Sequence, residues 1–388
     1  MKFIPYGRQN INYSDKLSVN QSLNQDFITS GRNVVLFEKK IQTILSCKYT
    51  VVCNSGTSAI HLALISVDLK KNDVVIMPSV NFIAAFNICN ILGAKIYLAD
   101  VDSFNGQMTP QNLLDCIKIN KLKNIKVVIT SQLGGQPLNN VEFYKIKKKH
   151  NFFLIEDACH SFGAKYYYKN KLINVGSCRH SDIATFSFHP VKSITTGEGG
   201  VVTTNNKSIA DKCRLFRSHG ILRKKNHWQY DVIFSGLNYR LSDINCALGI
   251  SQLKRLKKFI KYREDIARIY VKFFSKISNF VTIPYNLSKN LSSWHLFIIS
   301  INFEKLICNK VDFIKFLLKK KIITQFHYIP IYKFKVFNQK LKKKQIIGAE
   351  HYYQNSISLP IYFGLSKQKI SYILKNIEIF FKKYSKNL

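Results

Sequence analysis

The residue types that could take part in chemistry fall into three short segments of the chain. The first, residues 54–58 (NSGTS), places a glycine among hydroxyl side chains. Glycine lets the backbone approach a ligand closely, and the free N–H groups of a helix that begins here would favour a phosphate. A Ser/Thr-rich helix cap with only a structural role explains the same residues about equally well. This segment alone therefore does not establish a binding site.

The second segment, residues 156–160 (EDACH), follows the apolar run FFLI. A carboxylate at the end of a buried strand is costly unless a cation or a hydrogen-bond donor meets it. Asp157 is therefore a candidate for contact with a cationic or N–H-bearing ligand. The alternative is that Asp157 only caps the following turn.

The third segment, residues 186–200 (FSFHPVKSITTGEGG), contains a single lysine among aromatic, hydroxyl and glycine residues. At its ordinary pKa of about 10.4 a lysine is protonated at neutral pH and is a poor nucleophile. A lysine buried beside polar partners can instead form an imine with an aldehyde. The position of Lys192, between a strand-like run and a glycine-rich turn, favours the second behaviour.

The elements that must position these segments alternate between strands and helices. Apolar strand-like runs lie at residues 49–53, 73–77, 95–101, 126–130 and 152–155, and helical periodicity spans residues 55–67. Such alternation predicts a mostly parallel α/β sheet that is covered on both faces by helices. Two further strands, at 182–188 and 200–204, have no long helix between them, so the sheet is predicted to be mixed.

The pattern changes after residue 238. It predicts a long helix over about 242–275, strands at 294–301 and 322–328, a helix over about 311–320 and a terminal helix from residue 367. We therefore expect a large α/β domain over residues 1–250 and a smaller C-terminal α+β domain over residues 251–388.

The three segments complement one another because ligands of open α/β sheets bind at the carboxyl ends of the strands. A phosphate cradle, a strand-end carboxylate and a strand-end lysine are together what pyridoxal phosphate requires. Its phosphate would bind the helix start at Gly56, Asp157 would keep its pyridine nitrogen protonated, and Lys192 would carry it as an imine.

These motifs also resemble a known family. The segments NSGTSAIHLAL, PSVNFIAA, IEDACHSFGA, FSFHPVKSITTGEGG, RSHGI and NYRLSDINCALGISQLKRL are similar to motifs of the DegT-type sugar aminotransferases. The resemblance extends from about residue 4 to the C-terminus. It implies fold-type I of the pyridoxal-phosphate-dependent transferases, with a large mixed, mostly parallel sheet domain and a smaller C-terminal domain.

The resemblance assigns several residues to the cofactor. It implies Lys192 as the imine lysine, Asp157 as the partner of the pyridine nitrogen and His160 near the ring hydroxyl. The full cofactor set is Ser55, Gly56, Thr57, Phe82, Asp157, His160, Ser187, Lys192 and Asn238. Phe82 would stack on the ring, although its composition alone would place it in the core. Asn238 would reach the phosphate of the other subunit of a homodimer, although it could also be a loop cap.

The resemblance also assigns a substrate class. The features PY, RSHG followed by ILRKK, and QFHYIPIY at residues 325–332 imply transfer of an amino group from L-glutamate to C4 of a UDP-4-keto-6-deoxy-N-acetylhexosamine, a step of pseudaminic acid biosynthesis. The residues placed at the sugar nucleotide are Tyr6, Phe27, Ile28, Thr29, His327 and Tyr328. His327 and Tyr328 could alternatively be ordinary strand residues. Another nucleotide 4-keto sugar stays open as the substrate.

Composition excludes few other functions. The 59 Lys and Arg against 22 Asp and Glu give a net charge of +37, but no nucleic-acid-binding motif accompanies it, so we expect solvated basic faces and no nucleic-acid partner. The nine cysteines form no C-x-x-C pair and no zinc spacing, which predicts reduced thiols and no metal site. No apolar run reaches the length of a membrane span, so a cytoplasmic protein without a membrane partner is expected.

Two rival functions remain at this stage. A sugar dehydratase or deoxygenase would keep the fold and the cofactor, but in that branch of the family a histidine replaces the imine lysine, whereas position 192 is lysine. A regulatory protein associated with nucleic acid would need a binding module that the sequence does not contain.

Overall fold

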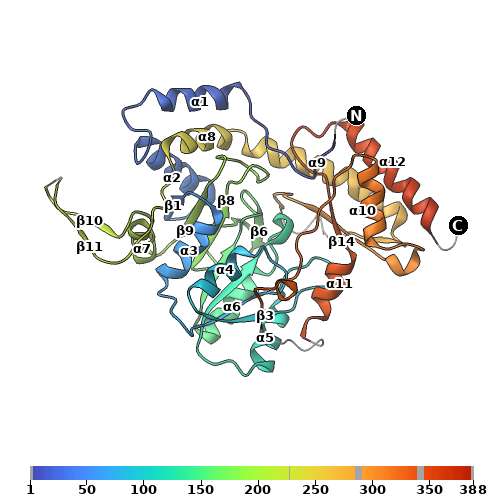
Figure 1. Cartoon of the computed structure of the whole chain (residues 1–388), viewed down its shortest axis with the longest axis horizontal. Coiled ribbons are helices and arrows are strands. Elements are labelled where there is room, and N and C mark those ends of the chain that lie inside the picture. The colour runs from blue at the N-terminus through green and yellow to red at the C-terminus, as the bar shows by residue number, and fades with distance from the viewer. Residues whose placement is uncertain (1–2, 227, 285–290, 339–344, 386–388) are drawn as a thin grey trace.

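A seven-stranded mixed sheet forms the centre of the protein in the computed structural model, which describes residues 3–226, 228–284, 291–338 and 345–385 (Figure 1). The strand order is β1-β9-β8-β5-β4-β2-β3. Its strands are β1 (Tyr49–Cys53), β2 (Val74–Pro78), β3 (Lys95–Ala99), β4 (Ile125–Ser131), β5 (Phe153–Asp157), β8 (Ile183–Ser187) and β9 (Gly200–Thr204). Each predicted strand of the first part of the chain is present, within a few residues of its expected bounds.

Strand direction explains where ligands can approach the sheet. The strands β3, β2, β4, β5 and β8 pair in parallel, while β9 is antiparallel to both β8 and β1. The carboxyl ends of β1, β2, β4, β5 and β8 therefore meet at one edge of the sheet, together with the start of β9. The predicted mixed, mostly parallel sheet is confirmed.

Helices cover both faces of this sheet. One face packs against α3 (Gly56–Ser66), α4 (Ala84–Ile91) and α7 (Lys207–Arg217) through the alternate apolar residues of the strands. The opposite face packs against α2 (Arg32–Leu45), α5 (Pro110–Ile119), α6 (Asn140–His150) and α8 (Asp243–Leu253). Because both faces are buried, the strands read as nearly continuous apolar runs in the sequence.

The C-terminal part has its own apolar core around a three-stranded antiparallel sheet of β12 (Val281–Thr282), β13 (Phe297–Ile301) and β14 (Ser356–Leu359). The helices α9 (Leu256–Phe274), α10 (Lys310–Lys319) and α12 (Lys367–Tyr384) pack on it and lie together in Figure 1. The helix α11 (Ile347–Asn355) precedes β14. The fold class predicted for the chain is confirmed, and the division at residues 250 and 251 stays a prediction.

Two expectations for this part were wrong. The single helix over 242–275 is two helices, α8 and α9, because Arg255 between them leaves helical geometry (φ −108°, ψ 1°). Residues 322–328 form no strand but only single bridges, from Ile322 to Ile4 and from Gln325 to Ser358. Their backbone follows the wall of a pocket described below instead of joining a sheet.

Three smaller elements lie outside these layers. The helix α1 (Tyr13–Leu23) packs on α8, and the hairpin β6 (Lys165–Tyr168) and β7 (Lys171–Asn174) follows β5. The hairpin β10 (Ile221–Arg223) and β11 (Tyr230–Val232) projects from the body of the molecule in Figure 1. Within the described ranges, no helix is both long enough and apolar enough to span a membrane.

Candidate active site

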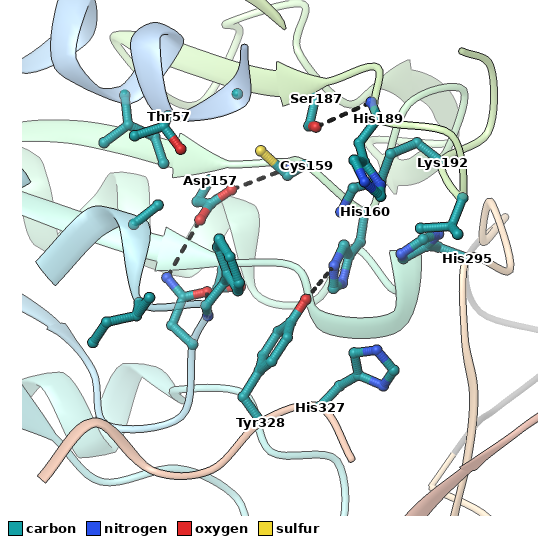
Figure 2. A pocket seen from close by; sticks show the side chains of 18 of the residues that line it. Thr57, Asp157, Cys159, His160, Ser187, His189, Lys192, His295, His327 and Tyr328 are labelled. Carbon is teal, nitrogen blue, oxygen red and sulfur yellow. Dashed lines mark hydrogen bonds between the residues drawn. The ribbon is translucent and has the colours of Figure 1, made fainter. Parts of the chain in front are cut away.

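The strand ends meet at a pocket of about 640 Å³ (Figure 2). Its walls come from the loops after β1, β2, β5 and β8, and a further wall comes from residues 325–329 of the C-terminal part. Eleven of the residues expected at the cofactor or the sugar line it: Tyr6, Ser55, Gly56, Thr57, Phe82, Asp157, His160, Ser187, Lys192, His327 and Tyr328. Segments far apart in the sequence are therefore brought together as expected.

Lys192 lies in the loop that joins β8 to the antiparallel β9, and its backbone N–H donates to the carbonyl of His189 (2.9 Å). Although part of the side chain is accessible from the pocket, desolvation by the surrounding protein lowers the pKa of Lys192 below its ordinary value. The charge of Asp157 opposes this shift, and the charge of Arg263 adds to it. The net effect favours a neutral, nucleophilic amine.

Asp157 is the last residue of β5, and its side chain is 6% exposed. Its carboxylate accepts from the side-chain amide of Asn81 (3.3 Å) and from the backbone N–H of Cys159 (3.3 Å), and Figure 2 marks the second of these bonds between labelled residues. Both hydrogen bonds are long, and neither donor is charged. A buried carboxylate with two weak donors has capacity for a further N–H group in the pocket.

The start of α3 forms the third side of the pocket. Ser55 is the N-cap of α3, and its hydroxyl accepts from the backbone N–H of Ser58 (3.1 Å). The first N–H groups of a helix have no acceptor inside that helix, and in α3 these are the N–H groups of Gly56 and Thr57. A Cβ on Gly56 would lie 2.8 Å from Cβ of Ser187. Glycine is required there because the helix start and the end of β8 approach so closely. The helix start and the hydroxyl-bearing residues Thr57 and Ser187 line the same pocket, a combination that suits an anion.

Histidines occupy the side of the pocket opposite α3. The backbone N–H of Gly134 donates to Nδ1 of His160 (3.3 Å), so the ring proton is on Nε2, which donates to the hydroxyl of Tyr328 (2.9 Å; Figure 2). The hydroxyl proton of Tyr328 is then available to a ligand. Burial, with the charge of Lys192, lowers the pKa of His160 well below its ordinary value, which agrees with a neutral ring.

Two further histidines adjoin His160. The ring of His295 lies 4.2 Å from that of His160, centroid to centroid, and its buried Nδ1 has no hydrogen-bond partner among the residues that the structure describes. Nδ1 of His327 is hydrogen-bonded to the hydroxyl of Ser358 (2.8 Å). Burial lowers the pKa of His327 to about 3, and that of His295 well below its ordinary value. All three imidazoles are therefore neutral at physiological pH.

The remaining expected residues divide into two groups. Phe82, half exposed, lies at the pocket and packs against Tyr328 (ring centroids 5.6 Å apart), not in the core. Asn238 and residues 27–29 do not line the pocket: Asn238 is exposed beside Asn54, and Thr29 forms a bridge with Ser242. The role of Asn238 toward a second subunit stays a prediction.

The sequence-based assignment missed several pocket residues, including Asn81, Cys159, Glu198 and His295. Asn81 was detectable, because it directly follows β2 within the motif PSVNFIAA. His295 had no such signal, because the run SSWHLF resembles an ordinary strand. Within the described ranges, no three His, Cys, Asp or Glu side chains form a cluster that could hold a metal ion.

The fold and this site define an aminotransferase. The sequence pattern of the DegT/DnrJ/EryC1/StrS aminotransferase family matches residues 9–378, and the chain belongs to that family. It is 36% identical over 370 residues to the UDP-4-amino-4,6-dideoxy-N-acetyl-beta-L-altrosamine transaminase of Campylobacter jejuni, with 95% of each chain covered. It is 32% identical to the GDP-perosamine synthase of Escherichia coli O157:H7, over 98% of this chain and 99% of that protein.

Solved structures agree. The Helicobacter pylori protein PseC, described as an aminotransferase involved in the biosynthesis of pseudoaminic acid, superposes with a TM-score of 0.88 at 30% identity, covering 98% of this chain and all of that one. The sugar aminotransferase Spr1654 of Streptococcus pneumoniae shares the fold with a TM-score of 0.89 at 24% identity.

Proposed function

We propose that the protein is a pyridoxal-phosphate-dependent aminotransferase that transfers the amino group of L-glutamate to C4 of a UDP-4-keto-6-deoxy-N-acetylhexosamine. The product would be UDP-4-amino-4,6-dideoxy-N-acetyl-beta-L-altrosamine, an intermediate of pseudaminic acid biosynthesis. The similarity to the Campylobacter jejuni transaminase over 95% of both chains supports this choice of sugar.

One observation carries the proposal of cofactor. The amine of Lys192, the carboxylate of Asp157 and the start of α3 line a single pocket. The close approach of Gly56 to Ser187 and the unused N–H groups of the helix start suit a phosphate, and the under-satisfied Asp157 suits a protonated ring nitrogen. The residues present therefore fit pyridoxal phosphate.

When bound, pyridoxal phosphate would supply an electron sink that stabilises negative charge at the substrate carbon that bears the amino group. Lys192 would hold it covalently, and Asp157 would hold the ring nitrogen in its protonated form. Ser55, Thr57 and Ser187 would bind the phosphate. Residues Tyr6, His327 and Tyr328 would contact the sugar nucleotide.

Lys192 would also move the protons of the reaction. Its Nζ would take the proton from Cα of glutamate, and in the second half-reaction it would deliver a proton to C4 of the sugar. Proton transfer by a positioned side chain contributes typically about 10²- to 10⁴-fold to a rate. Because burial lowers the pKa of Lys192, a larger share of its amine is neutral and able to accept a proton than for an exposed lysine.

The test is incubation of the purified protein with pyridoxal phosphate, L-glutamate and one sugar at a time. The sugars are the UDP-4-keto-6-deoxy-N-acetylhexosamines of the L-arabino and D-xylo series and a GDP-4-keto-6-deoxyhexose, with products identified by mass and NMR. Amination of the L-arabino compound is expected. Preference for the GDP sugar would instead favour the activity for which the 32% identical Escherichia coli protein is named.

We also propose that the active unit is a homodimer in which Asn238 serves the site of the partner subunit. Asn238 supports this because it is exposed and lies outside the pocket of its own chain. Mixing Lys192→Ala with Asn238→Ala protein tests the idea, since a mixed dimer would contain one site with both residues intact. After random exchange, about a quarter of wild-type turnover is expected. Absence of any recovery, with exchange demonstrated, would contradict a shared site.

A further inference from the structure

Arg263 is a buried cation of the C-terminal part of the chain. It lies on α9 and is 3% exposed. The arginines on either side differ: Arg255 pairs with Asp15, and Arg268 pairs with Glu264 on the surface. In the part of the chain that the structure describes, no carboxylate is paired with Arg263. Burial lowers its pKa to about 10, so the guanidinium remains charged at neutral pH.

Four backbone carbonyls accept hydrogen bonds from the guanidinium of Arg263. Nη2 donates to the carbonyls of Val191 and Lys192 (both 3.3 Å), and Nη1 donates to those of Trp294 and His295 (both 3.4 Å). The first pair belongs to the loop after β8, and the second precedes β13 of the C-terminal sheet. One side chain therefore joins the backbone of the pocket lysine to the backbone of a pocket histidine.

The charge of Arg263 also acts on the Lys192 amine. The groups that interact electrostatically with this amine are Asp157, Cys159, His160, His295, His327 and Arg263. The three imidazoles are neutral, as shown above, and burial raises the pKa of the Cys159 thiol well above its ordinary value, so this thiol is also uncharged. Asp157 and Arg263 are therefore the charges that oppose one another at Lys192.

We propose that Arg263 is a positioning residue of the transamination reaction, which fixes the backbone of Lys192 and His295 and places a positive charge near the lysine amine. This inference rests on the proposed function. The carbonyl dipoles hold the guanidinium without neutralising its charge, whereas a carboxylate partner would cancel its field. The field favours the neutral amine that must accept the proton from Cα of glutamate.

The guanidinium has two separable contributions, and two substitutions distinguish them. Arg263→Met removes both the charge and the four hydrogen bonds. Arg263→Lys keeps the charge but cannot reproduce the planar fork that reaches four carbonyls. Arg268→Met is the matched control, because it removes an exposed arginine from the same helix.

The first measurement uses cofactor-free protein and needs no substrate. Acetylation of Lys192 by limiting acetic anhydride is followed against pH by mass spectrometry, because only the neutral amine reacts. In Arg263→Met, labelling at neutral pH is expected to slow by roughly five- to tenfold, with the midpoint moved to higher pH. Arg263→Lys and Arg268→Met are expected to label like the wild type.

The second measurement is turnover as a function of pH. Arg263→Met should shift the pH profile in the same direction as the labelling curve, and Arg263→Lys should lower kcat by about tenfold at an unchanged KM for the sugar. A merely structural arginine would lower stability but leave both pH curves in place. Unshifted curves in Arg263→Met would overturn the charge effect, and wild-type kcat in Arg263→Lys would overturn the positioning effect.

The proposal can still be tested if Arg263→Met does not fold or if the wild type aminates no sugar. If Arg263→Met does not fold, Arg263→Lys decides alone: slowed labelling or an undiminished kcat would contradict the proposal. If no sugar is aminated by the wild type, the proposed function fails, but the labelling of cofactor-free protein still measures the effect of Arg263 on Lys192.

Discussion

Glu156 gives the most quantitative prediction. It is 4% exposed on β5, and its Oε1 accepts from the side-chain amide of Asn140 (2.7 Å). Burial raises its pKa from an ordinary value of 4.5 to about 7, and the hydrogen bond from Asn140 offsets only part of this. The folded protein therefore keeps a proton on Glu156 in a pH range where the unfolded chain has released it.

The sign and size of the effect follow from linkage. Below pH 4.5 the residue is protonated in both states, and above about pH 7 it is ionised in both, so the free energy of unfolding falls as pH rises through this window. At 1.36 kcal/mol per pKa unit, the loss is about 3 kcal/mol. Glu156→Gln stays neutral at every pH and keeps an acceptor for Asn140, so it avoids this loss.

The assay is denaturant unfolding of cofactor-free protein from about pH 5 to about pH 8, comparing Glu156→Gln with the wild type. The stability of the variant relative to the wild type should increase by about 2.5 kcal/mol across that range, because part of the loss falls below pH 5. Glu142→Gln makes the same chemical change at an exposed position of α6 and provides the baseline. A difference that is constant with pH would refute the reasoning, because it would mean that water reaches Glu156 in the folded protein.

Three further predictions concern the pocket. Lys192→Ala should abolish turnover and the absorbance of covalently held cofactor, both measured by spectrophotometry, while Lys207→Ala, at an exposed site, should keep both. Asp157→Asn should lower kcat by about 10- to 100-fold, as loss of a charge-assisted hydrogen bond would, with an unchanged melting temperature by calorimetry. Gly56→Ala should weaken pyridoxal phosphate binding by about tenfold in a fluorescence titration, because the new Cβ would lie 2.8 Å from Ser187. Cofactor binding unchanged by that methyl group would show that the helix start is not part of the cradle.

The central sheet and three sides of the pocket were predictable from the sequence. The parallel strands are buried on both faces, so each reads as a short apolar run whose end is clearly marked, and polar residues that follow such runs must meet at one edge. Asp157 and Gly56 were found in this way. Lys192 was found because a lysine is unusual between a strand and a glycine-rich turn.

Features that depend on distant contacts were not predictable. The break between α8 and α9 contains neither proline nor glycine, and the side chain of Arg255 there binds Asn10 (2.7 Å) and Asp15 near the N-terminus. Residues 322–328 have the alternation of a strand, but they form only single bridges, and residues 325–328 belong to a wall of the pocket. His295 enters the site only because the C-terminal sheet is placed beside the loop of Lys192.

The antiparallel pairing of β8 with β9 has a consequence for how the enzyme acquires its cofactor during biosynthesis. Ser187 of β8 pairs with Gly200 of β9 at the two ends of the short loop that contains Lys192. On the other side of β9, Cys53 of β1 also pairs with Gly200, and this contact can form only after the whole intervening chain has been made. Short loops close at a small entropic cost, and contacts between distant segments form late. The loop that contains Lys192 should therefore form well before α3 reaches its place beside β8. We expect that the newly made chain would bind pyridoxal phosphate only near the end of folding.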